Sequence, residues 1–301
     1  MFSLKTLQVG NDPVACIDIL GRSYPIQASA ERIGDLELPA SIYEVFADWE
    51  RYFPMLEKLA KGIELCSDLA ITENAKTLTP LLYPGKILCA GANYYDHLEE
   101  MGFPAEKKDQ RLFFFFKPSR QAAVGHGASV PIPAGCKKYD WEVELALVIG
   151  KKARSISLET ALDYVAGYTV AIDLSARDFA RAPDQFYKFD WVAGKAHDAS
   201  CPLGPSIIPS CFISDPQDLR MRLWVNDDLK QDARTSGMIF DIREQLVRLT
   251  EIMTLEPGDI VLTGTPAGVG AAAGKFLQAG DIVTAEIETL GRLSVDITQP
   301  G

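Results

Sequence analysis

The segment from Glu142 to Ile149 constrains the fold most, because it places two acidic residues in the apolar run EVELALVI. Alternate residues of a β-strand project to the same face, so Glu142 and Glu144 share one face and Leu145 and Leu147 lie on the other. Two neighbouring carboxylates repel each other unless a cation lies between them. We therefore expect a strand that carries part of a functional site.

Asp173 is a further acidic residue in apolar surroundings, near the end of the predicted strand YTVAIDL. A carboxylate buried there needs a partner. Three carboxylates with no Cys or His at matching spacing describe a site for a hard divalent cation, Mg²⁺ first and Mn²⁺ or Ca²⁺ next. The alternative is that Glu142, Glu144 and Asp173 are all solvated at strand ends. The pattern alone favours neither interpretation over the other.

The charge balance narrows the choice of partners. The 301 residues include 30 Lys and Arg against 41 Asp and Glu, which gives a formal net charge of −11. An acidic surface repels phosphate backbones and anionic lipids, and no run of Lys and Arg is longer than two. The apolar fraction of 47% is that of an ordinary folded domain. We expect neither nucleic acid nor a membrane as a partner.

The N-terminal stretch has Lys5 and Asp12 before any long apolar run, so it does not resemble a signal peptide. No stretch approaches the roughly 18 apolar residues of a membrane-spanning helix, and we expect a cytoplasmic protein. The six cysteines show no CxxC pair and are expected to be free, buried thiols. They are Cys16, Cys66, Cys89, Cys136, Cys201 and Cys211.

The chain divides into two parts by composition. Residues 1–80 predict a small α/β domain with two strands and a helical stretch from about Ser41 to Leu65, where Ser41 and Glu44 form a capping box. Pro80, Pro84 and Gly85 then indicate a linker. Residues 86–301 predict a strand-rich domain. The expected fold class is therefore α+β and β-rich.

Few helices are expected in the second part. One is predicted from Ser157 to Gly167, and a second is capped by Asp241 with Glu244. Between them, Asn226-Asp227-Asp228 separates two apolar runs and predicts a β-hairpin.

His97 and Glu100 follow a short predicted strand and lie in a helical run. Residues three apart are neighbours on one helical face, so the carboxylate can orient the imidazole for proton transfer. A solvated surface pair is the alternative that the pattern alone favours.

A Gly-rich loop from Thr263 to Lys275 follows the predicted strand DIVLTG. It lacks the spacing of GxxxxGK and of GxGxxG, so it does not indicate a nucleotide site. Its glycines would let backbone amides and Thr265 approach a ligand closely.

Several motifs in this order resemble the fumarylacetoacetate hydrolase superfamily. The resemblance runs from about residue 86 to 298 and rests on GANYYDHLEEMG, FFFFKPS, DWEVELALVIGKKAR, DYVAGYTVAIDLSARD, KAHDASCPLGP, RTSGMIF and EPGDIVLTGTPAGVG. It implies a C-terminal domain of the β-roll type, a small variable N-terminal domain, a homodimer and one divalent metal ion.

The resemblance also implies roles for individual residues. The metal ligands would be Glu142, Glu144 and Asp173. The catalytic residues would be His97, Glu100 and Lys195. The residues that bind substrate would be Arg177, Thr265, Gly264 and Lys117. Ala180 departs from the pattern, since members with an ARDxQ run carry a glutamine there that can help to place substrate or water.

The activity that the resemblance implies is Mg²⁺-dependent hydrolysis of the C–C bond in a small anionic β-diketo acid of the acylpyruvate or fumarylpyruvate type. The alternatives are isomerisation of 2-hydroxy-dienoates and decarboxylation of acids that resemble oxaloacetate. An alternative of another class is a binding protein that keeps the metal without catalysis.

Overall fold

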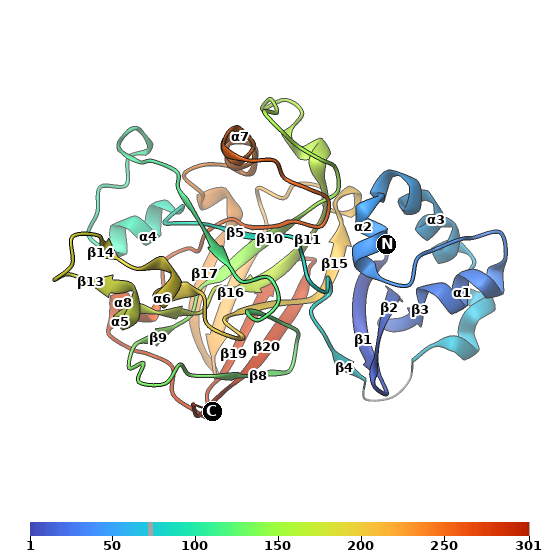
Figure 1. The fold of residues 1–301 in the computed structure, drawn as a ribbon, viewed down its shortest axis with the longest axis horizontal. Coiled ribbons are helices and arrows are strands. Elements are labelled where there is room, and N and C mark those ends of the chain that lie inside the picture. The colour runs from blue at the N-terminus through green and yellow to red at the C-terminus, as the bar shows by residue number, and fades with distance from the viewer. Residues whose placement is uncertain (72–74, 301) are drawn as a thin grey trace.

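Two lobes make up the fold in the computed structural model, which describes residues 1–71 and 75–300 (Figure 1). The N-terminal lobe holds β1 to β4, α1 to α3 and η1, and the rest of the described chain forms the larger lobe. The α-helices are α1 (Ile26–Ile33), α2 (Ile42–Ala47), α3 (Trp49–Lys61), α4 (Tyr95–Glu100), α5 (Arg177–Ala180), α6 (Trp191–Lys195), α7 (Ile242–Ile252) and α8 (Gly270–Ala273). Short 3₁₀ helices are η1 (Ile63–Leu69), η2 (Lys107–Asp109), η3 (Ala161–Tyr164), η4 (Ser210–Phe212) and η5 (Thr235–Gly237).

One large sheet runs through both lobes in the order β3-β2-β1-β15-β11-β10-β18-β5-β6, with β4 paired to β1 and β7 to β15. Residues Val143–Ile149 of the run EVELALVI form β10, which is antiparallel to β11 and to β18, and Glu142 directly precedes it. The strands of this sheet are β1 (Ser3–Val9), β2 (Asp12–Ile19), β3 (Arg22–Pro25), β4 (Lys76–Thr77), β5 (Ile87–Ala90), β6 (Phe114–Lys117), β7 (Ala123–Val124), β10 (Val143–Ile149), β11 (Val165–Ile172), β15 (Cys201–Pro209) and β18 (Ile260–Leu262).

A second sheet, in the order β17-β16-β19-β20-β8, packs on β10, β11 and β15. Its strands are β8 (Ala128–Pro131), β16 (Arg220–Val225), β17 (Asp228–Arg234), β19 (Ile282–Ile287) and β20 (Gly291–Thr298). Two small ladders pair β9 (Tyr139–Asp140) with β12 (Ser175–Ala176) and β13 (Arg181–Ala182) with β14 (Lys188–Phe189). The strand-rich α+β fold predicted from the sequence is confirmed.

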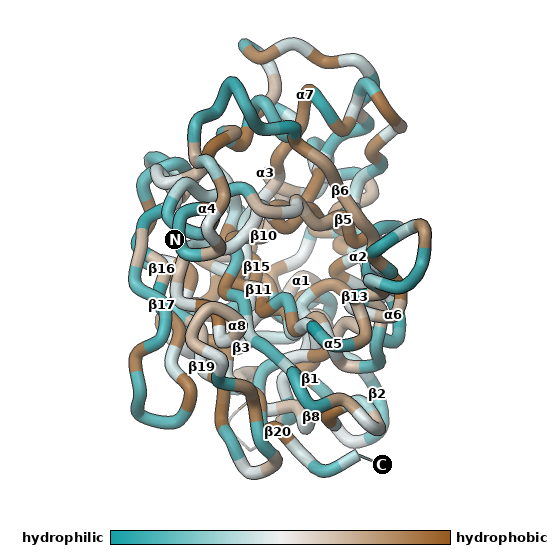
Figure 2. The backbone as a smooth tube through the Cα atoms, turned by 90° about the vertical axis from the view of Figure 1, so that its left-hand side faces the viewer, coloured by the Kyte–Doolittle hydropathy of each residue, from teal (hydrophilic) through white to brown (hydrophobic). Residues whose placement is uncertain are grey.

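The two faces of β10 contribute to two hydrophobic cores, as the alternation of its residues predicted. Leu145 and Leu147 pack in the core between the two sheets. Ala146 and Val148 pack in the second core, which also contains Phe46 and other residues of the N-terminal lobe. Figure 2 shows hydrophobic stretches where β10, β11 and β15 run through the middle of the molecule. The two lobes therefore share a sheet and a core.

Two predicted helices differ from those observed. The stretch 41–65 is divided at Asp48, whose backbone leaves the helical region, into α2 and α3, although the capping box of Ser41 and Glu44 is present. The helix predicted over 157–167 is wrong, because Val165 already pairs with Ile149 of β10 and leaves room for η3 alone. Strand pairing thus overrides the local helical signal. The hairpin of β16 and β17 and the capped helix α7 are confirmed.

All six cysteines are free. Four are buried as expected, whereas Cys136 is half-buried and Cys211 is exposed, so the expectation of burial is wrong for these two. Within the described ranges, no helix has the length and apolar character needed to cross a membrane.

Candidate active site

Strand pairing brings the three acidic residues together. Val143 of β10 lies opposite Ile172 of β11, so the next residues outward, Glu142 and Asp173, are also neighbours. The amide of Asp173 donates to the carbonyl of Glu142 at 2.8 Å. Glu144 lies two residues along the same strand. One ligand oxygen from each of the three carboxylates lies within 4.8 Å of the others, and all three residues are buried. We call Glu142, Glu144 and Asp173 the acidic triad.

The members of the acidic triad differ in their electrostatic surroundings. Burial alone raises the pKa of Glu142, but the charges of Lys195 and Arg177 outweigh burial and hold the pKa of this carboxyl well below its ordinary value. Burial raises the pKa of Glu144 well above its ordinary value, and the charges of Asp173 and Glu142 add to the rise. Glu144 is therefore the member whose negative charge is least compensated.

Two cationic side chains contact the acidic triad. Lys195, at the end of α6, donates to Oε2 of Glu142 and Oδ2 of Asp173, both at 2.7 Å. Arg177, at the start of α5, donates to Oε1 of Glu142 at 2.6 Å. Both residues line the same cavity as Glu142 and Glu144. The sequence prediction that Lys195 and Arg177 belong to this site agrees with their placement.

The structure places Lys117 away from the cavity in which it was expected to contact substrate. It is fully buried and is absent from the residues that line the cavity in the described part of the chain. Its ammonium donates to the carbonyls of Leu174, Lys195 and Ser200 and lies 2.8 Å from Oδ1 of Asp173. These contacts assign Lys117 to holding Asp173 and α6 in place, which corrects the expectation that it binds substrate.

The acidic triad fits a divalent cation. Its donors are hard carboxylate oxygens, which Mg²⁺ and Mn²⁺ prefer. Three buried carboxylates that converge within 4.8 Å repel one another, and Lys195 offsets that repulsion for Glu142 and Asp173. Glu144 forms no ion pair within the part of the chain that the structure describes, and its Oε2 accepts the Gly264 amide at 2.5 Å. A cation beside Glu144 would supply the missing compensation.

His97 and Glu100 form a hydrogen-bonded pair on α4. Nδ1 of His97 lies 2.7 Å from Oε1 of Glu100, and His97 is buried and lines the cavity that also contains Glu142 and Glu144. The alternative of a solvated surface pair is therefore wrong. Asn93 anchors the segment before α4, because its amide donates to the carbonyls of Thr263 and Phe240 at 2.9 and 3.0 Å.

The Gly-rich loop directs its backbone amides at carboxylates of the site. The amide of Gly264 donates to Glu144, and the amide of Gly268 donates to Oε2 of Glu100 at 2.9 Å. Thr265 lines the cavity, and its hydroxyl donates to the Val143 carbonyl at 2.9 Å. Gly264 was expected to contact substrate, but it does not line the cavity among the described residues and acts on Glu144 instead.

Asp140 is a residue beside the site to which the sequence motifs gave no role. It is fully buried, and its carboxylate accepts the amides of Gly270 and Ala271 at 2.7 and 2.9 Å and Nε of Arg177 at 2.9 Å. It therefore joins the Gly-rich loop to the arginine that contacts Glu142. The sequence contains a signal for Asp140, because this residue continues the alternation of acidic residues at Glu142 and Glu144.

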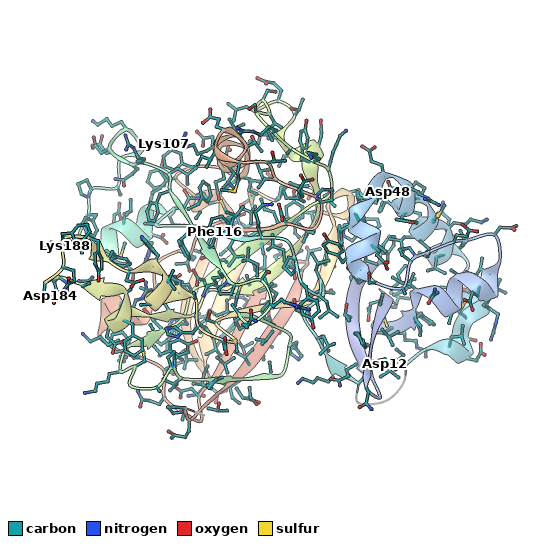
Figure 3. All side chains as sticks on the ribbon, in the orientation of Figure 1. Asp12, Asp48, Lys107, Phe116, Asp184 and Lys188 are labelled. Atoms are coloured by element: carbon teal, nitrogen blue, oxygen red, sulfur yellow. The ribbon has the colours of Figure 1, made fainter. Side chains whose placement is uncertain are left out.

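One cavity of about 720 Å³ is lined by six of the residues described above, which are His97, Glu142, Glu144, Arg177, Lys195 and Thr265. Ala180 lines it where the glutamine of the ARDxQ pattern would lie. The hairpin of β13 and β14 borders the cavity through Arg181 and Phe189. Figure 3 shows Asp184 and Lys188 of this hairpin at the end of the molecule opposite the N-terminal lobe. The cavity is therefore bordered by a hairpin that lies far from the N-terminal lobe.

The chain is similar in sequence to known proteins. Residues 86–298 match the family described as "Fumarylacetoacetate (FAA) hydrolase C-terminal". The chain is 42% identical to the mitochondrial oxaloacetate tautomerase of Xenopus laevis over 73% of this chain and 68% of the relative. It is 36% identical to the oxaloacetate tautomerase YisK of Bacillus subtilis over 90% of this chain and 91% of the relative.

A solved structure agrees over the full length. The maleylpyruvate hydrolase of Sphingobium sp. SYK-6, in complex with manganese(II) and pyruvate, superposes with a TM-score of 0.74 at 29% identity and covers 100% of both chains. The family match over residues 86–298 spans the positions of the acidic, basic and histidine residues of the site. The chain therefore belongs to the fumarylacetoacetate hydrolase family and is an enzyme.

Proposed function

We propose that this enzyme hydrolyses the C–C bond of a β-diketo acid of the acylpyruvate type. One observation carries the proposal: His97, which is hydrogen-bonded to Glu100, lines the same cavity as Glu142 and Glu144 of the acidic triad. A general base thus lies in one compartment with a site for the cation that would bind the 2-oxo acid end of the substrate. The cavity volume of about 720 Å³ leaves room for an acyl group beyond that end.

His97 is the proposed general base. When Nδ1 carries the proton and donates it to Glu100, Nε2 is left with a free lone pair. Nε2 would accept a proton from the water molecule that attacks the distal carbonyl of the substrate. Glu100 then acts by fixing the tautomer and by stabilising the imidazolium.

The reaction balances with water as the co-reactant. The water oxygen bonds to the distal carbonyl carbon, and its proton passes to Nε2 of His97. The bond between that carbon and the neighbouring methylene breaks, and its electron pair goes to the pyruvate half as an enolate. The proton then passes from His97 to the methylene carbon, so the products are a carboxylic acid and pyruvate.

Lys195 and Arg177 place two positive charges beside the acidic triad, where the 2-oxo acid end would lie. A divalent cation held by Glu142, Glu144 and Asp173 would supply the charge that stabilises the enolate. We propose Mg²⁺ or Mn²⁺, with Ca²⁺ as a further candidate. Hard oxygen donors support this choice, as does the manganese named with pyruvate in the Sphingobium hydrolase.

The experiment is a spectrophotometric assay with purified protein and Mg²⁺. Loss of the enol absorbance of acetylpyruvate, together with the formation of one pyruvate and one acetate per molecule, is the expected result. Absorbance loss without either product would overturn hydrolysis.

Tautomerisation of oxaloacetate is the second candidate function. It is favoured by the identities of 42% and 36% to proteins that carry that name. The His97–Glu100 pair could move a proton between carbon and oxygen without attack by water. Rapid conversion of enol-oxaloacetate to the keto form, with the four-carbon acid recovered intact, would favour this candidate. Release of CO₂ would instead favour decarboxylation.

The assembly and location of the enzyme remain predictions. The family resemblance implies a homodimer, so light scattering should give twice the mass of one chain. A cytoplasmic location is likewise a prediction, which cell fractionation tests.

A further inference from the structure

Four aromatic side chains form one wall of the active-site cavity. Trp191 lies at the centre, with its ring centroid 4.9 Å from that of Phe115, 5.3 Å from that of Phe113 and 4.5 Å from that of Phe189. Phe115 stacks on Trp191 at an interplanar angle of 13°. All four side chains line the cavity. We call Phe113, Phe115, Phe189 and Trp191 the aromatic wall.

The aromatic wall is continuous with the catalytic groups. The ammonium of Lys195 lies 5.1 Å from the centroid of the Phe115 ring, within the range of a cation–π contact. The same ammonium contacts Glu142 and Asp173 of the acidic triad. A substrate whose carboxylate end lay at the acidic triad would therefore extend its other end along the aromatic wall.

The backbone is shaped to keep one of these rings in the cavity. Gly91, at the end of β5, lines the cavity, and its amide donates to the Phe113 carbonyl at 3.1 Å. A Cβ atom at this position would lie 2.1 to 2.7 Å from three atoms of the Phe113 ring. A glycine is thus required for the observed position of the Phe113 ring.

Two rings of the aromatic wall remain uncovered. Phe113 is 37% exposed and Phe189 is 39% exposed, although both line a cavity. Exposed aromatic surface on residues that line a cavity lacks the stabilisation that a covering group would supply. A flat aromatic group fits best, because offset and edge-to-face ring contacts add to the gain from burial alone.

We propose that the aromatic wall is a specificity subsite for an aryl group, carried on the acyl end of the substrate. The proposal rests on the proposed function, because it places the 2-oxo acid end at the acidic triad. It names the preferred substrate class as aroylpyruvates, in preference to substrates with short aliphatic acyl groups. A four-carbon diacid would leave the aromatic wall uncovered.

The test measures binding, so it does not depend on turnover. The probe is 4-phenyl-2-oxobutanoate, which has no second carbonyl to hydrolyse, and its unbranched alkyl counterpart is 2-oxohexanoate. Calorimetric titration of the protein in the presence of Mg²⁺ should show that the phenyl compound binds at least about tenfold more tightly. Phe113→Leu and Trp191→Leu should each reduce this ratio several-fold.

The control is Phe116→Leu. Phe116 is on the same strand as Phe115, is 53% exposed and does not line the cavity, and it is labelled in Figure 3. This variant should retain the wild-type ratio of affinities. Circular dichroism identifies a variant that fails to fold. If Trp191→Leu fails to fold, the milder change Phe113→Leu carries the test.

Equal affinity for the two compounds in the wild-type protein would overturn the proposal, as would an unchanged ratio in folded Phe113→Leu. Failure of the proposed function has a different signature. If acetylpyruvate and benzoylpyruvate are both left uncleaved while the phenyl compound binds more tightly, hydrolysis is wrong and the subsite stands.

Discussion

The backbone amide of Gly268 donates to Oε2 of Glu100 at 2.9 Å, across 168 residues of sequence. The other oxygen of the same carboxylate lies 2.7 Å from Nδ1 of His97. The Gly-rich loop therefore holds the carboxylate that orients the histidine. The same loop contacts the acidic triad through Gly264, so one segment positions both the base and the metal ligands.

Replacement of Glu100 tests this arrangement. Glu100→Gln removes the negative charge beside His97, and we expect kcat for acylpyruvate hydrolysis to fall roughly 100-fold. The affinity for Mg²⁺, measured by calorimetry, should stay unchanged because Glu100 is not in the acidic triad. Glu99→Gln is the matched control, since Glu99 is on the same helix and is exposed. Equal kcat in the two variants would contradict the role of Glu100.

Removal of metal should lower stability as well as activity. A ligand that binds the folded state at 100 times its Kd stabilises it by about 2.7 kcal/mol. We expect a thermal melt of chelator-treated protein to show a higher midpoint after Mg²⁺ or Mn²⁺ is added. Glu144→Gln should abolish this rise. A rise of the same size in Glu144→Gln would place the cation elsewhere.

Gly264 tests the tight packing of the Gly-rich loop. Its φ is +99°, and a Cβ atom there would lie 2.8 Å from Cβ of Asn93. Gly264→Ala should lower the free energy of unfolding by about 3 kcal/mol, because strain and a clash combine. Gly274→Ala is the control, since its φ is +65° and no atom lies within 4 Å of a Cβ atom there. It should cost about 1 kcal/mol in urea unfolding. Similar losses in the two variants would show that the clash is relieved.

Asp140 should be important for stability as well as for the site. Asp140→Asn removes a buried charge that pairs with Arg177 and accepts the amides of Gly270 and Ala271. We expect a loss of about 3 kcal/mol in urea unfolding, since the buried ion pair is broken and Arg177 keeps only its contact with Glu142. The exposed Asp163→Asn should change stability little. A wild-type unfolding midpoint in Asp140→Asn would show that the amides alone hold the loop.

The proposed domain boundary between residues 80 and 86 can be tested by truncation. A chain that begins at Lys86 would lose β1, which pairs with β15, and the part of the core that covers Ala146 and Val148. We expect this fragment to aggregate or to unfold without a cooperative transition, with the full chain as the reference. A soluble fragment with cooperative unfolding would show that the domain folds on its own.

Local spacing along the chain determined much of the site. Glu142 and Glu144 share a face because alternate strand residues do so, and His97 and Glu100 meet because they lie three apart on a helix. Asp173 was indicated by its acidic side chain in an apolar strand, and the family resemblance of the motifs added Lys195 and Arg177. Each of these inferences depends on periodicity or on motif, and both are properties of the amino-acid order itself.

Tertiary structure alone decided which distant groups satisfy these residues. The ammonium of Lys117 is enclosed by carbonyls, Asp140 receives amides from a loop 130 residues away, and Gly268 holds Glu100. The helix predicted over 157–167 does not form, because pairing with the distant strand β10 takes residues from Val165 onward. Buried polar groups take whichever partners the packing brings near, and a sequence pattern with a short period carries no information about contacts between residues so far apart.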